Sequence, residues 1–398
     1  MSFVFKRLSS TATPIRKTAL YELHTSLGGT MVPFAGYSMP VKYAKQTHIQ
    51  SHNWTREHAG LFDVSHMLQS SLSGPEATKF LHKITPTDFS KVPLNQGTLS
   101  VLLLPETGGI VDDTLITKQK DDQYYIVTNA GCIEQDTKFF RNQLKDSGFN
   151  CNWEPISGRA LLALQGPTAH LALKKLVKNS DGLDHLFFGC RKNFQLNNGV
   201  DVEIARCGYT GEDGFEISIP NEKSMEFAEA LLRDAEVEPI GLAARDSLRL
   251  EAGMCLYGHE LNTDITPVEA SLNWVISKSR RGEGGSCTEK FNGFSKIMDQ
   301  LNNKSYNRVR VGFQYLTRGA AARHETRIFD ADGKREIGVV TSGSASPSLQ
   351  HTNIGQAFVE RGLHKKGTKL TVQVRNRFYP IEIVRMPFVP THYYKPNY

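Results

Sequence analysis

The sequence predicts an α+β fold followed by a separate all-β domain. A chain of 398 residues is too long for one hydrophobic core, so two or three domains are expected. Strand-like and helix-like segments are mixed without regular β–α–β alternation, which favours an α+β fold over a doubly wound sheet. From about Arg308, short strand candidates follow one another with turn signals and little helix, which indicates a barrel or sandwich.

The first 21 residues have the composition of an organelle transit peptide. They contain Lys6, Arg7, Arg16 and Lys17 and no acidic residue, together with hydroxyl and apolar residues. We predict a leader at residues 1–18, although a disordered basic tail has the same composition. Without these four positive charges the formal net charge falls from +6 to +2, so nucleic-acid binding is not indicated.

The region after the leader predicts strands and helices in turn. Residues 18–29 predict a short helix, and residues 31–43, interrupted by two prolines and a glycine, predict an irregular segment. Residues 97–130 predict a β-meander of three strands. Strand-to-helix segments are expected at 161–177 and 202–236, and a further helix is expected at 242–252.

A charged, glycine-rich segment at 278–293 separates this region from the C-terminal strands. No hydrophobic strand leads into a GxxxxGK[ST] or GxGxxG pattern there, so a solvated linker is expected. We therefore predict one region at 19–290 and a β domain at 291–398. No run of about 18 apolar residues indicates a membrane span. The strands of the β domain are expected at 308–316, 335–343, 368–375 and 378–386.

Two adjacent carboxylates, Asp112 and Asp113, lie in a predicted strand of the meander, after a turn at Gly108 and Gly109. Neighbouring strand residues point to opposite faces, so both acids can face one pocket only if the strand is irregular. One acid is expected to face a site, and the other to face solvent or a backbone partner. The flanking residues do not decide between them, and both could be solvated acids near a hairpin end.

Further acids follow in the segment GYTGEDGFEISIP. Its glycines allow a tight turn in which Glu212 and Asp213 are expected to be exposed. Glu216 lies in the next strand, where alternate residues are apolar, and a carboxylate there needs a partner. It could accept both donors of a heterocycle that carries an N–H beside an amino group, as a pterin does. The alternative is an acid on the solvent face of the sheet.

Arg245 and Arg249 lie four residues apart and share one face of the helix predicted at 242–252. Two arginines on one face suit an anionic ligand. Because Asp246 can pair with Arg249, a structural ion-pair network is an equal alternative. His66, in a largely apolar stretch, is expected to be a buried core histidine.

The sequence shows no signature of a catalytic nucleophile or a metal site. GxSxG and HExxH patterns are absent. The six cysteines form no CxxC pair, which predicts buried free thiols. From these residues alone we expect a soluble α+β enzyme or binding protein whose carboxylates and arginines suit a polar, anionic heterocycle.

The motifs taken together resemble one family, the T-protein of the glycine cleavage system. The resemblance covers about residues 18–394 in the order of the family. It implies a three-lobed folate-binding aminomethyltransferase fold, with two interleaved α+β lobes at 19–290 and a C-terminal β-barrel at 291–398. The strings that carry it are LFDVSHM, TGGIVDD, LALQGP, CGYTGEDGFEI, GLAARDSLRLEAGMCLYG, TPVEASLNW, TSGSASPSL and MPFVPTHYY.

The resemblance implies a tetrahydrofolate-dependent aminomethyltransferase of glycine catabolism in the mitochondrial matrix. Its substrate would be the aminomethyl group on the lipoyl arm of the H-protein, and its products 5,10-methylenetetrahydrofolate, ammonia and the dihydrolipoyl H-protein. The P- and L-proteins of the same system would be further partners. No metal, nucleic acid or membrane is implied.

The resemblance also assigns roles to residues at matching positions. Asp113 matches the catalytic aspartate, and we expect Asp112 to support it. Glu216 matches the pterin-binding glutamate, whereas Leu99 stands where many bacterial members have a pocket-lining tyrosine. Arg245 and Tyr393 match further folate or substrate contacts of the family, and Met67, Asn129 and Tyr209 match its pocket-lining positions.

Two related groups match less well. The folate-binding domains of dimethylglycine and sarcosine demethylases accompany a flavin domain with a Rossmann glycine motif, which this sequence lacks. A non-enzymatic folate-binding factor of iron–sulfur assembly carries a KGCYxGQ-like segment, where this chain has EAGMCLYGHE. Both differences favour the transferase.

Overall fold

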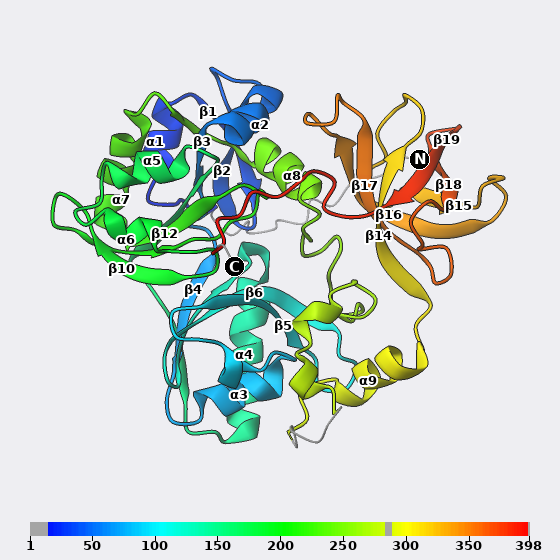
Figure 1. The fold of residues 1–398 in the computed structure, drawn as a ribbon, viewed down its shortest axis with the longest axis horizontal. Helices are drawn as coiled ribbons and strands as arrows, with labels where there is room; N and C mark the ends of the chain where they lie inside the picture. Colours follow the sequence, from blue (N-terminus) through cyan, green and yellow to red (C-terminus); the bar gives the residue numbers. More distant parts are fainter. Residues whose placement is uncertain (1–14, 283–288, 397–398) are drawn as a thin grey trace, which may run out of the picture.

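The chain folds into three lobes, two of mixed α and β structure and one β-barrel (Figure 1). The computed structural model describes residues 15–282 and 289–396, so most of the predicted leader lies outside the described residues. Within the first lobe, the backbone of Arg16 forms an isolated parallel β-bridge with that of Tyr37. The buried hydroxyl of Thr18 donates a hydrogen bond to Asp63. None of the described helices has the length and apolar character needed to cross a membrane.

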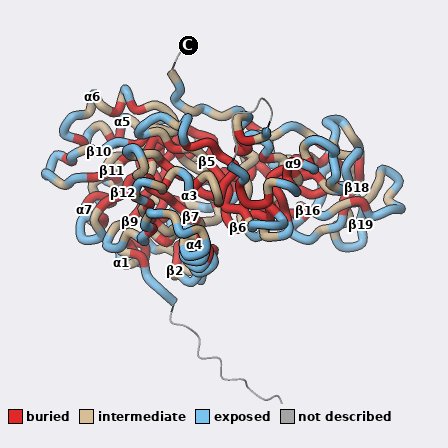
Figure 2. Tube along the Cα trace, turned by 90° about the horizontal axis from the view of Figure 1, so that it is seen from below, coloured by how far each residue is buried: buried red, intermediate tan, exposed pale blue. Residues whose placement is uncertain are grey.

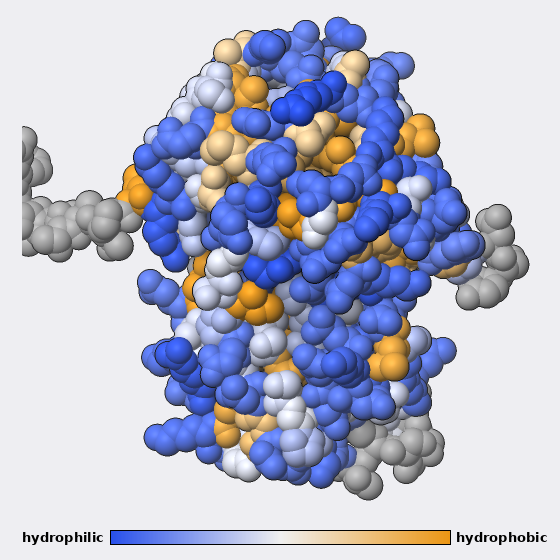
Figure 3. All heavy atoms as spheres, turned by 90° about the vertical axis from the view of Figure 1, so that its left-hand side faces the viewer, coloured by the Kyte–Doolittle hydropathy of each residue, from blue (hydrophilic) through white to orange (hydrophobic). Residues whose placement is uncertain are grey.

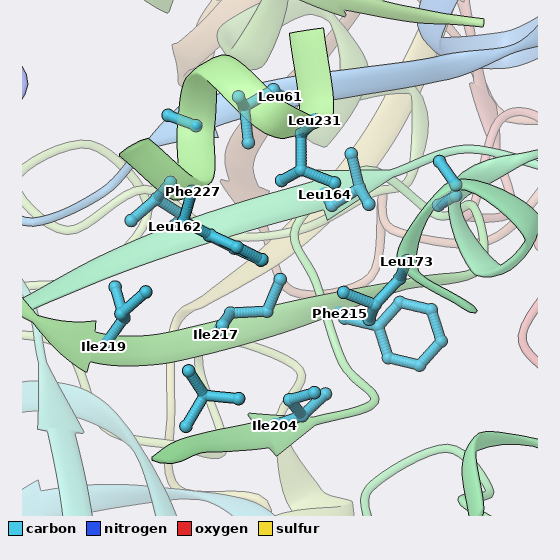
Figure 4. Packing of buried hydrophobic residues seen from close by; sticks show 14 of the residues in the cluster. Leu61, Leu162, Leu164, Leu173, Ile204, Phe215, Ile217, Ile219, Phe227 and Leu231 are labelled. Carbon is cyan, nitrogen blue, oxygen red and sulfur yellow. The ribbon is translucent and has the colours of Figure 1, made fainter. Parts of the chain in front are cut away.

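The first lobe is built on a six-stranded sheet of order β10-β11-β12-β9-β3-β13. All neighbours are antiparallel except β13 and β3. Alternation along β12 places Phe215, Ile217 and Ile219 in a core with helices α5 and α7 (Figure 4). The bounds are β3 Ala59–Asp63, β9 Arg159–Gln165, β10 Arg191–Gln195, β11 Asp201–Ala205, β12 Gly214–Pro220, β13 Val237–Pro239, α1 Tyr21–Ser26, α2 His48–Glu57, α5 Ala169–Lys174, α6 Asp181–Asp184, α7 Asn221–Leu232 and α8 Leu242–Glu251. The predicted helices and strand-to-helix segments of this region are confirmed.

A two-stranded hairpin, β1 (Gly29–Phe34) and β2 (Tyr37–Tyr43), precedes this sheet. The prediction of an irregular segment at 31–43 is therefore wrong. The chain reverses at Ala35 and Gly36, which have φ of 49° and 78°, as a tight hairpin turn requires. Proline is tolerated within both strands because each strand of a two-stranded sheet has a free edge.

The second lobe is inserted between β3 and β9 of the first, which confirms that the two lobes are interleaved. Its five-stranded sheet has the order β5-β6-β7-β4-β8, and β5, β6 and β7 form the predicted meander. Helices α3 and α4 bury Phe80 and Phe140 in its core. The bounds are β4 Leu68–Ser73, β5 Gly97–Leu103, β6 Ile110–Lys120, β7 Gln123–Thr128, β8 Asn152–Pro155, α3 Ala77–Ile84, α4 Ile133–Ser147, η1 Phe89–Lys91 and η2 Ala130–Cys132.

The third lobe is a closed barrel of order β14-β17-β16-β15-β18-β19, which the pairing of β19 with β14 completes. The four expected strands are confirmed as β14, β16, β18 and β19, whereas β15 and β17 were not predicted. Strand β17 contains Gly355, where a Cβ would lie 2.4 Å from the ring of Phe313, and an interior glycine weakens a strand pattern. The bounds are β14 Arg308–Tyr315, β15 Arg327–Phe329, β16 Glu336–Ala345, β17 Asn353–Glu360, β18 Lys369–Val374 and β19 Arg377–Val384.

The predicted linker is only partly described, because residues 283–288 lie outside the described residues. Its first residues form η4 (Lys278–Arg280), η3 (Asn273–Val275) precedes it, and α9 (Phe294–Asn303) follows it. The prediction of a solvated loop is wrong for Arg280, which is buried and donates a hydrogen bond to a backbone carbonyl of α3. Helix α9 packs Ile297 into an apolar cluster with strands β5 and β6. The passage into the barrel is therefore anchored to the second lobe.

A shared apolar core joins the first two lobes. Phe62 and Ala163 of the first sheet meet Tyr125 and Val127 of the second, and Leu248 of α8 completes the cluster. Figure 2 shows buried segments running through the middle of the molecule, and Figure 3 shows a mostly hydrophilic outer face over these lobes. Apolar contact thus holds the two sheets against each other.

Glu251, at the end of α8, ties the first lobe to the barrel. Its buried carboxylate accepts hydrogen bonds from Arg56 (2.9 Å), Ser346 (2.5 Å) and Ser348 (2.7 Å) and lies 3.0 Å from His52 Nε2. Burial would raise the pKa of Glu251, but the hydrogen bonds and the charges of these partners lower it to about 2. The carboxylate is therefore ionised and fully partnered.

We expect Glu251→Gln to lower the free energy of unfolding by about 3 kcal/mol, because removing one member of a buried ion pair leaves its partners without compensation. Urea unfolding at pH 7 measures the change. Since its pKa is lowered, the stabilisation from Glu251 is present above the usual glutamate pKa and is lost as the pH falls toward about 2. Glu360→Gln, in an exposed pair with Arg335, is the control and should change stability by less than about 1 kcal/mol. Equal effects of the two variants would contradict this view of Glu251.

Candidate active site

The residues predicted for the site come from both α+β lobes and from the C-terminal segment. Strand β12 and helix α8 belong to the first lobe, and β6 and the end of β7 belong to the second. The predicted residues are Asp112 and Asp113 on β6, Asn129 after β7, Tyr209 between β11 and β12, Glu216 on β12, Arg245 on α8, Met67 before β4 and Tyr393 beyond β19.

The two aspartates differ sharply in their surroundings. Asp112 is completely buried and accepts hydrogen bonds from the backbone N–H (2.8 Å) and the side-chain amide (2.9 Å) of Asn129. The same amide donates to the carboxylate of the half-buried Asp113, also over 2.9 Å. The expectation that one acid takes a backbone partner is confirmed for Asp112. The strand is irregular here, because Val111 forms a bulge opposite β5, so one amide can reach both carboxylates.

The turn before these acids requires glycine. Gly108 has φ of +66°, and a Cβ on Gly109 would lie 1.8 Å from the carbonyl oxygen of Thr263. The backbone of the turn can therefore pass against the segment that follows α8. Ile110, the next residue, donates its N–H to backbone carbonyls of this segment, which fixes the start of β6.

Burial and mutual repulsion make the aspartates poor acids. Burial, together with the charge of Asp112, raises the pKa of Asp113 to about 7, although the amide of Asn129 opposes the shift. Burial likewise raises the pKa of Asp112, against two hydrogen bonds from Asn129. Asp113 can therefore gain or lose a proton near neutral pH, the property expected of an acid–base group.

Arg245 is the centre of a second group of site residues. Its guanidinium carbon lies 4.7 Å from the centre of the Tyr209 ring, and no residue in the described ranges forms an ion pair with it. Burial lowers the pKa of Arg245, and the charge of Glu216 opposes this shift. Burial raises the pKa of Glu216 in turn, and Arg245 opposes it. The two charges act on each other without a salt bridge.

Tyr209 connects this group to the aspartates. Burial and the charge of Asp113 raise the pKa of the Tyr209 hydroxyl, whereas Arg249 and Arg245 lower it. The hydroxyl donates a hydrogen bond to the carbonyl of Cys255. Asp113, Tyr209 and Arg245 are thus electrostatically linked.

The two arginines of α8 have different roles. Arg249 is buried and donates to Asp246 (2.8 Å), Glu260 (3.0 Å) and Ser342 of the barrel (2.8 Å). The pairing of Arg249 with Asp246 is as predicted. The alternative of a structural ion-pair network therefore holds for Arg249, whereas Arg245 lies beside the site residues with no ion-pair partner among the described residues.

The expectation that Glu212 and Asp213 are exposed is wrong. Glu212 is buried, accepts a hydrogen bond from Arg56 (2.8 Å) and lies 2.7 Å from His392 Nδ1. Asp213 is half-buried and accepts from Arg206 (2.9 Å). The chain beyond the barrel lies against their loop, where the N–H of His392 donates to the loop backbone. A segment distant in the sequence thus covers an otherwise exposed turn.

Tyr393 belongs to this covering segment, which runs from the barrel back to the first lobe (Figure 1). Its ring stacks on Phe188 with centroids 4.1 Å apart, and it lines a pocket of about 520 Å³ together with Asp213 and Lys395. Burial raises its pKa to about 12. In the described ranges, no hydrogen bond, ion pair or ring contact joins Tyr393 to Arg245.

Met67 and His66 lie beside the shared core. Met67 is partly buried against the cluster that joins the two sheets. His66 is buried as predicted, with its ring edge-on to Phe34 and Tyr37 at centroid distances of 5.6 and 6.3 Å. Burial lowers the pKa of His66 to about 4, so the ring is neutral near pH 7.

Two acids near Asp113 were missed in the sequence. Glu260 is buried beside Arg249, and its charge helps to raise the pKa of Asp113. Asp136 is completely buried on α4, near Asp112. A signal existed for Asp136, because the helical period places it on the same face as the buried Phe139 and Phe140.

The described cysteines are free thiols, as predicted. Cys132 and Cys207 are buried, and three others are half-buried, whereas Cys287 lies outside the described residues. Across residues 15–282 and 289–396, no group of three or more histidine, cysteine and acidic side chains could hold a metal ion.

Comparisons with known proteins cover nearly the whole chain. The family model for the GCVT N-terminal domain matches residues 20–280, and the one for the glycine cleavage T-protein C-terminal barrel domain matches residues 308–390. The mitochondrial aminomethyltransferase of Saccharomyces cerevisiae is 65% identical over 98% of each chain. The probable mitochondrial aminomethyltransferase of Schizosaccharomyces pombe is 48% identical over the same shares.

A solved structure gives the same answer. The glycine cleavage system aminomethyltransferase T from Bartonella henselae matches with a TM-score of 0.85 and 36% identity, over 96% of this chain and 100% of that chain. The three lobes and these matches define an enzyme of the aminomethyltransferase class. The chain belongs to the glycine cleavage T-protein family, which is folate-dependent.

We expect Asn129→Ala to raise the pKa of Asp113 by about one to two units, because a hydrogen bond to a charged group is worth about 1.5–3 kcal/mol and one unit corresponds to about 1.4 kcal/mol. Carbon NMR of aspartate carboxyls, with Asp113→Asn to assign the resonance, measures the titration. Glu216→Gln, which leaves the amide of Asn129 in place, is the control. An unchanged or lower midpoint in Asn129→Ala would refute the role of this amide.

Proposed function

We propose that the chain transfers the one-carbon unit of the aminomethyl-dihydrolipoyl H-protein to tetrahydrofolate. The products are 5,10-methylenetetrahydrofolate, ammonia and the dihydrolipoyl H-protein. Membership of the T-protein family supports the system and the reaction class. The chain acts in the mitochondrion, as its named relatives do, and we place it in the matrix with the P- and L-proteins of the same system.

The observation that carries the proposal is the state of Asp113. It is a half-buried carboxyl with a pKa raised to about 7, held by Asn129 at 2.9 Å. Its oxygens can hold or release a proton at neutral pH. Asp113 is therefore our candidate for the general base or proton relay. Asp112, which is completely buried, supports it through Asn129.

The residues of the second group fit a folate. Glu216 is a half-buried acceptor without an ion pair in the described ranges, which suits the paired N–H donors of a pterin. Arg245 supplies a positive charge that no acid of the described ranges pairs with, and Tyr209 offers an aromatic face beside it. Tetrahydrofolate, when bound, supplies the amine nitrogen that takes up the one-carbon unit. Met67, Asn129 and Tyr393 are proposed as further lining or folate and substrate contacts.

The chain organisation belongs to the same proposal. We propose that residues 1–18 form a mitochondrial leader, that residues 19–290 form the folate-binding catalytic region and that residues 291–398 form the barrel domain. The closed barrel of β14 to β19 and the buried ties through Glu251 support a separate but anchored third lobe. Cleavage at the proposed leader is tested by N-terminal sequencing of the protein isolated from mitochondria.

We expect Asp113→Asn to lower kcat by about 10²–10⁴-fold, the usual worth of a positioned acid–base group, and Asp112→Asn to have a smaller effect. The assay follows ammonia and methylenetetrahydrofolate from aminomethylated H-protein. Because Asp113 must be ionised to act as a base, kcat/KM of the wild type should fall as the pH drops through about 7, and this limb should be missing in Asp113→Asn. Asp121→Asn, an exposed neighbour on the same hairpin, is the control. Wild-type activity of Asp113→Asn would exclude this role.

We expect Glu216→Gln to weaken tetrahydrofolate binding by about 10–100-fold, because charge-assisted hydrogen bonds are worth about 1.5–3 kcal/mol. Isothermal titration calorimetry measures the Kd. Glu222→Gln makes the same change at an exposed position of α7 and should leave Kd unchanged. Equal Kd values for Glu216→Gln and the wild type would remove Glu216 from the site, and folate binding without turnover in the wild type would indicate a binding protein.

A further inference from the structure

Asp136 is a buried acid that no positive charge of the described residues compensates. It lies in the first turn of α4, is completely buried and shares its face with Phe139 and Phe140. Neither of its carboxyl oxygens has a hydrogen-bond donor within 3.5 Å in the described part of the chain, and the nearby hydroxyl of Thr128 only partly opposes the rise of its pKa. No lysine, arginine or histidine of the described ranges forms an ion pair with it, and no metal-binding group includes it. An ionised carboxylate in such a place is strongly destabilised.

The neighbour of Asp136 is another carboxyl, that of Asp112. The two side chains are close enough to act as hydrogen-bond partners. Two carboxyl groups form such a bond only if one of them holds a proton, because ionised carboxylates have no donor. A single proton also removes the repulsion that two buried negative charges would suffer.

The contacts of Asp112 decide which acid holds the proton. Both of its oxygens already accept hydrogen bonds from Asn129, one from the backbone N–H at 2.8 Å and one from the side-chain amide at 2.9 Å. An acid whose oxygens both act as acceptors is the ionised member of the pair. The proton therefore belongs to Asp136.

We propose that Asp136 is a positioning residue whose protonated carboxyl donates to Asp112, so that Asp112 stays ionised and holds the Asn129 amide against Asp113. The inference rests on the proposed acid–base role of Asp113. It assigns Asp136 no contact with substrate. Asp136 on α4 thus acts on Asp112, Asp112 holds Asn129, and Asn129 positions the carboxyl of Asp113 that is proposed to react.

The electrostatics of the cluster agree with this assignment. Burial and the charge of Asp112 raise the pKa of Asp136 to about 10, so that its carboxyl is neutral at pH 7. The Asp112–Asp136 pair then carries one negative charge. Two charges beside Asp113 would raise its pKa well above the value near 7 at which it can exchange protons.

Infrared spectroscopy tests the proton directly. The carbonyl stretch of a protonated carboxylic acid is separate from the bands of a carboxylate. We expect the wild-type spectrum at pH 9, where Asp113 is ionised and Asp136 still holds its proton, to contain a protonated-acid band that Asp136→Asn lacks. Asp63→Asn is the matched control, because Asp63 is also buried but accepts hydrogen bonds from Thr18 and His24 that lower its pKa against the effect of burial. A spectrum of Asp136→Asn that retains the band would overturn the proposal.

Kinetics separate positioning from packing. The amide of Asp136→Asn can still donate to Asp112, so this variant should retain most of kcat and the wild-type pH profile. In Asp136→Ala, the carboxylate of Asp112 loses the hydrogen bond from Asp136 and takes up a proton. The negative charge of Asp112 then no longer raises the pKa of Asp113. We expect kcat to fall about 10-fold or more, KM for tetrahydrofolate to stay unchanged, and the acid limb of kcat/KM to move to lower pH.

The outcomes of the two experiments are distinguishable. Asp136→Ala with the kcat and pH profile of the wild type would overturn the positioning role, as would an equal loss of activity in Asp136→Asn and Asp136→Ala. If wild-type protein shows no aminomethyl transfer, the proposed function fails, and the infrared comparison still decides whether Asp136 carries the proton. That comparison needs only the isosteric Asp136→Asn variant and therefore does not depend on whether Asp136→Ala folds.

Discussion

The buried ion pairs of helix α8 are the constraint on which the rest of the structure depends. Glu251 binds Arg56 of α2 and two serines that follow β16, and Arg249 binds Glu260 and Ser342 of the barrel. Charges buried in this way are tolerated only if every one is partnered. Because the partners come from two lobes, the barrel cannot shift without exposing unpaired charge. The same helix presents Arg245 to the candidate site.

The contrast between paired and unpaired charges marks the site. Arg249, Glu251 and Glu212 are all buried and all paired. Arg245 and Glu216 are half-buried and, within the described residues, have no ion-pair partner. Keeping these two charges away from water without an ion-pair partner costs free energy of desolvation, and a bound polar ligand would offset this cost. Burial is also the first cause of the raised pKa values of Asp113 and Glu216. The free energy lost by removing these carboxylates from water therefore appears as a stronger binding of protons.

Local rules predicted the elements that depend on neighbours in the sequence. The meander of β5, β6 and β7 followed from turn residues and strand-forming runs, and α8 followed from the helical period and Gly253. The hairpin of β1 and β2 was missed because its two prolines argue against strands. Strand β17 was missed because Gly355 makes room for the ring of Phe313, a neighbour from another strand.

The sequence by itself determined the order of the elements and the positions of the motifs, because these depend on residue spacing. Only the tertiary structure decided burial and partnership. In the folded chain, the segment of His392 covers Glu212, and Arg249 donates a hydrogen bond to Ser342 of the barrel. Asp136 of α4 lies beside Asp112. The reason is physical: desolvation and pairing of a charge are set by groups from distant parts of the chain, and they alone determine which carboxyl holds a proton.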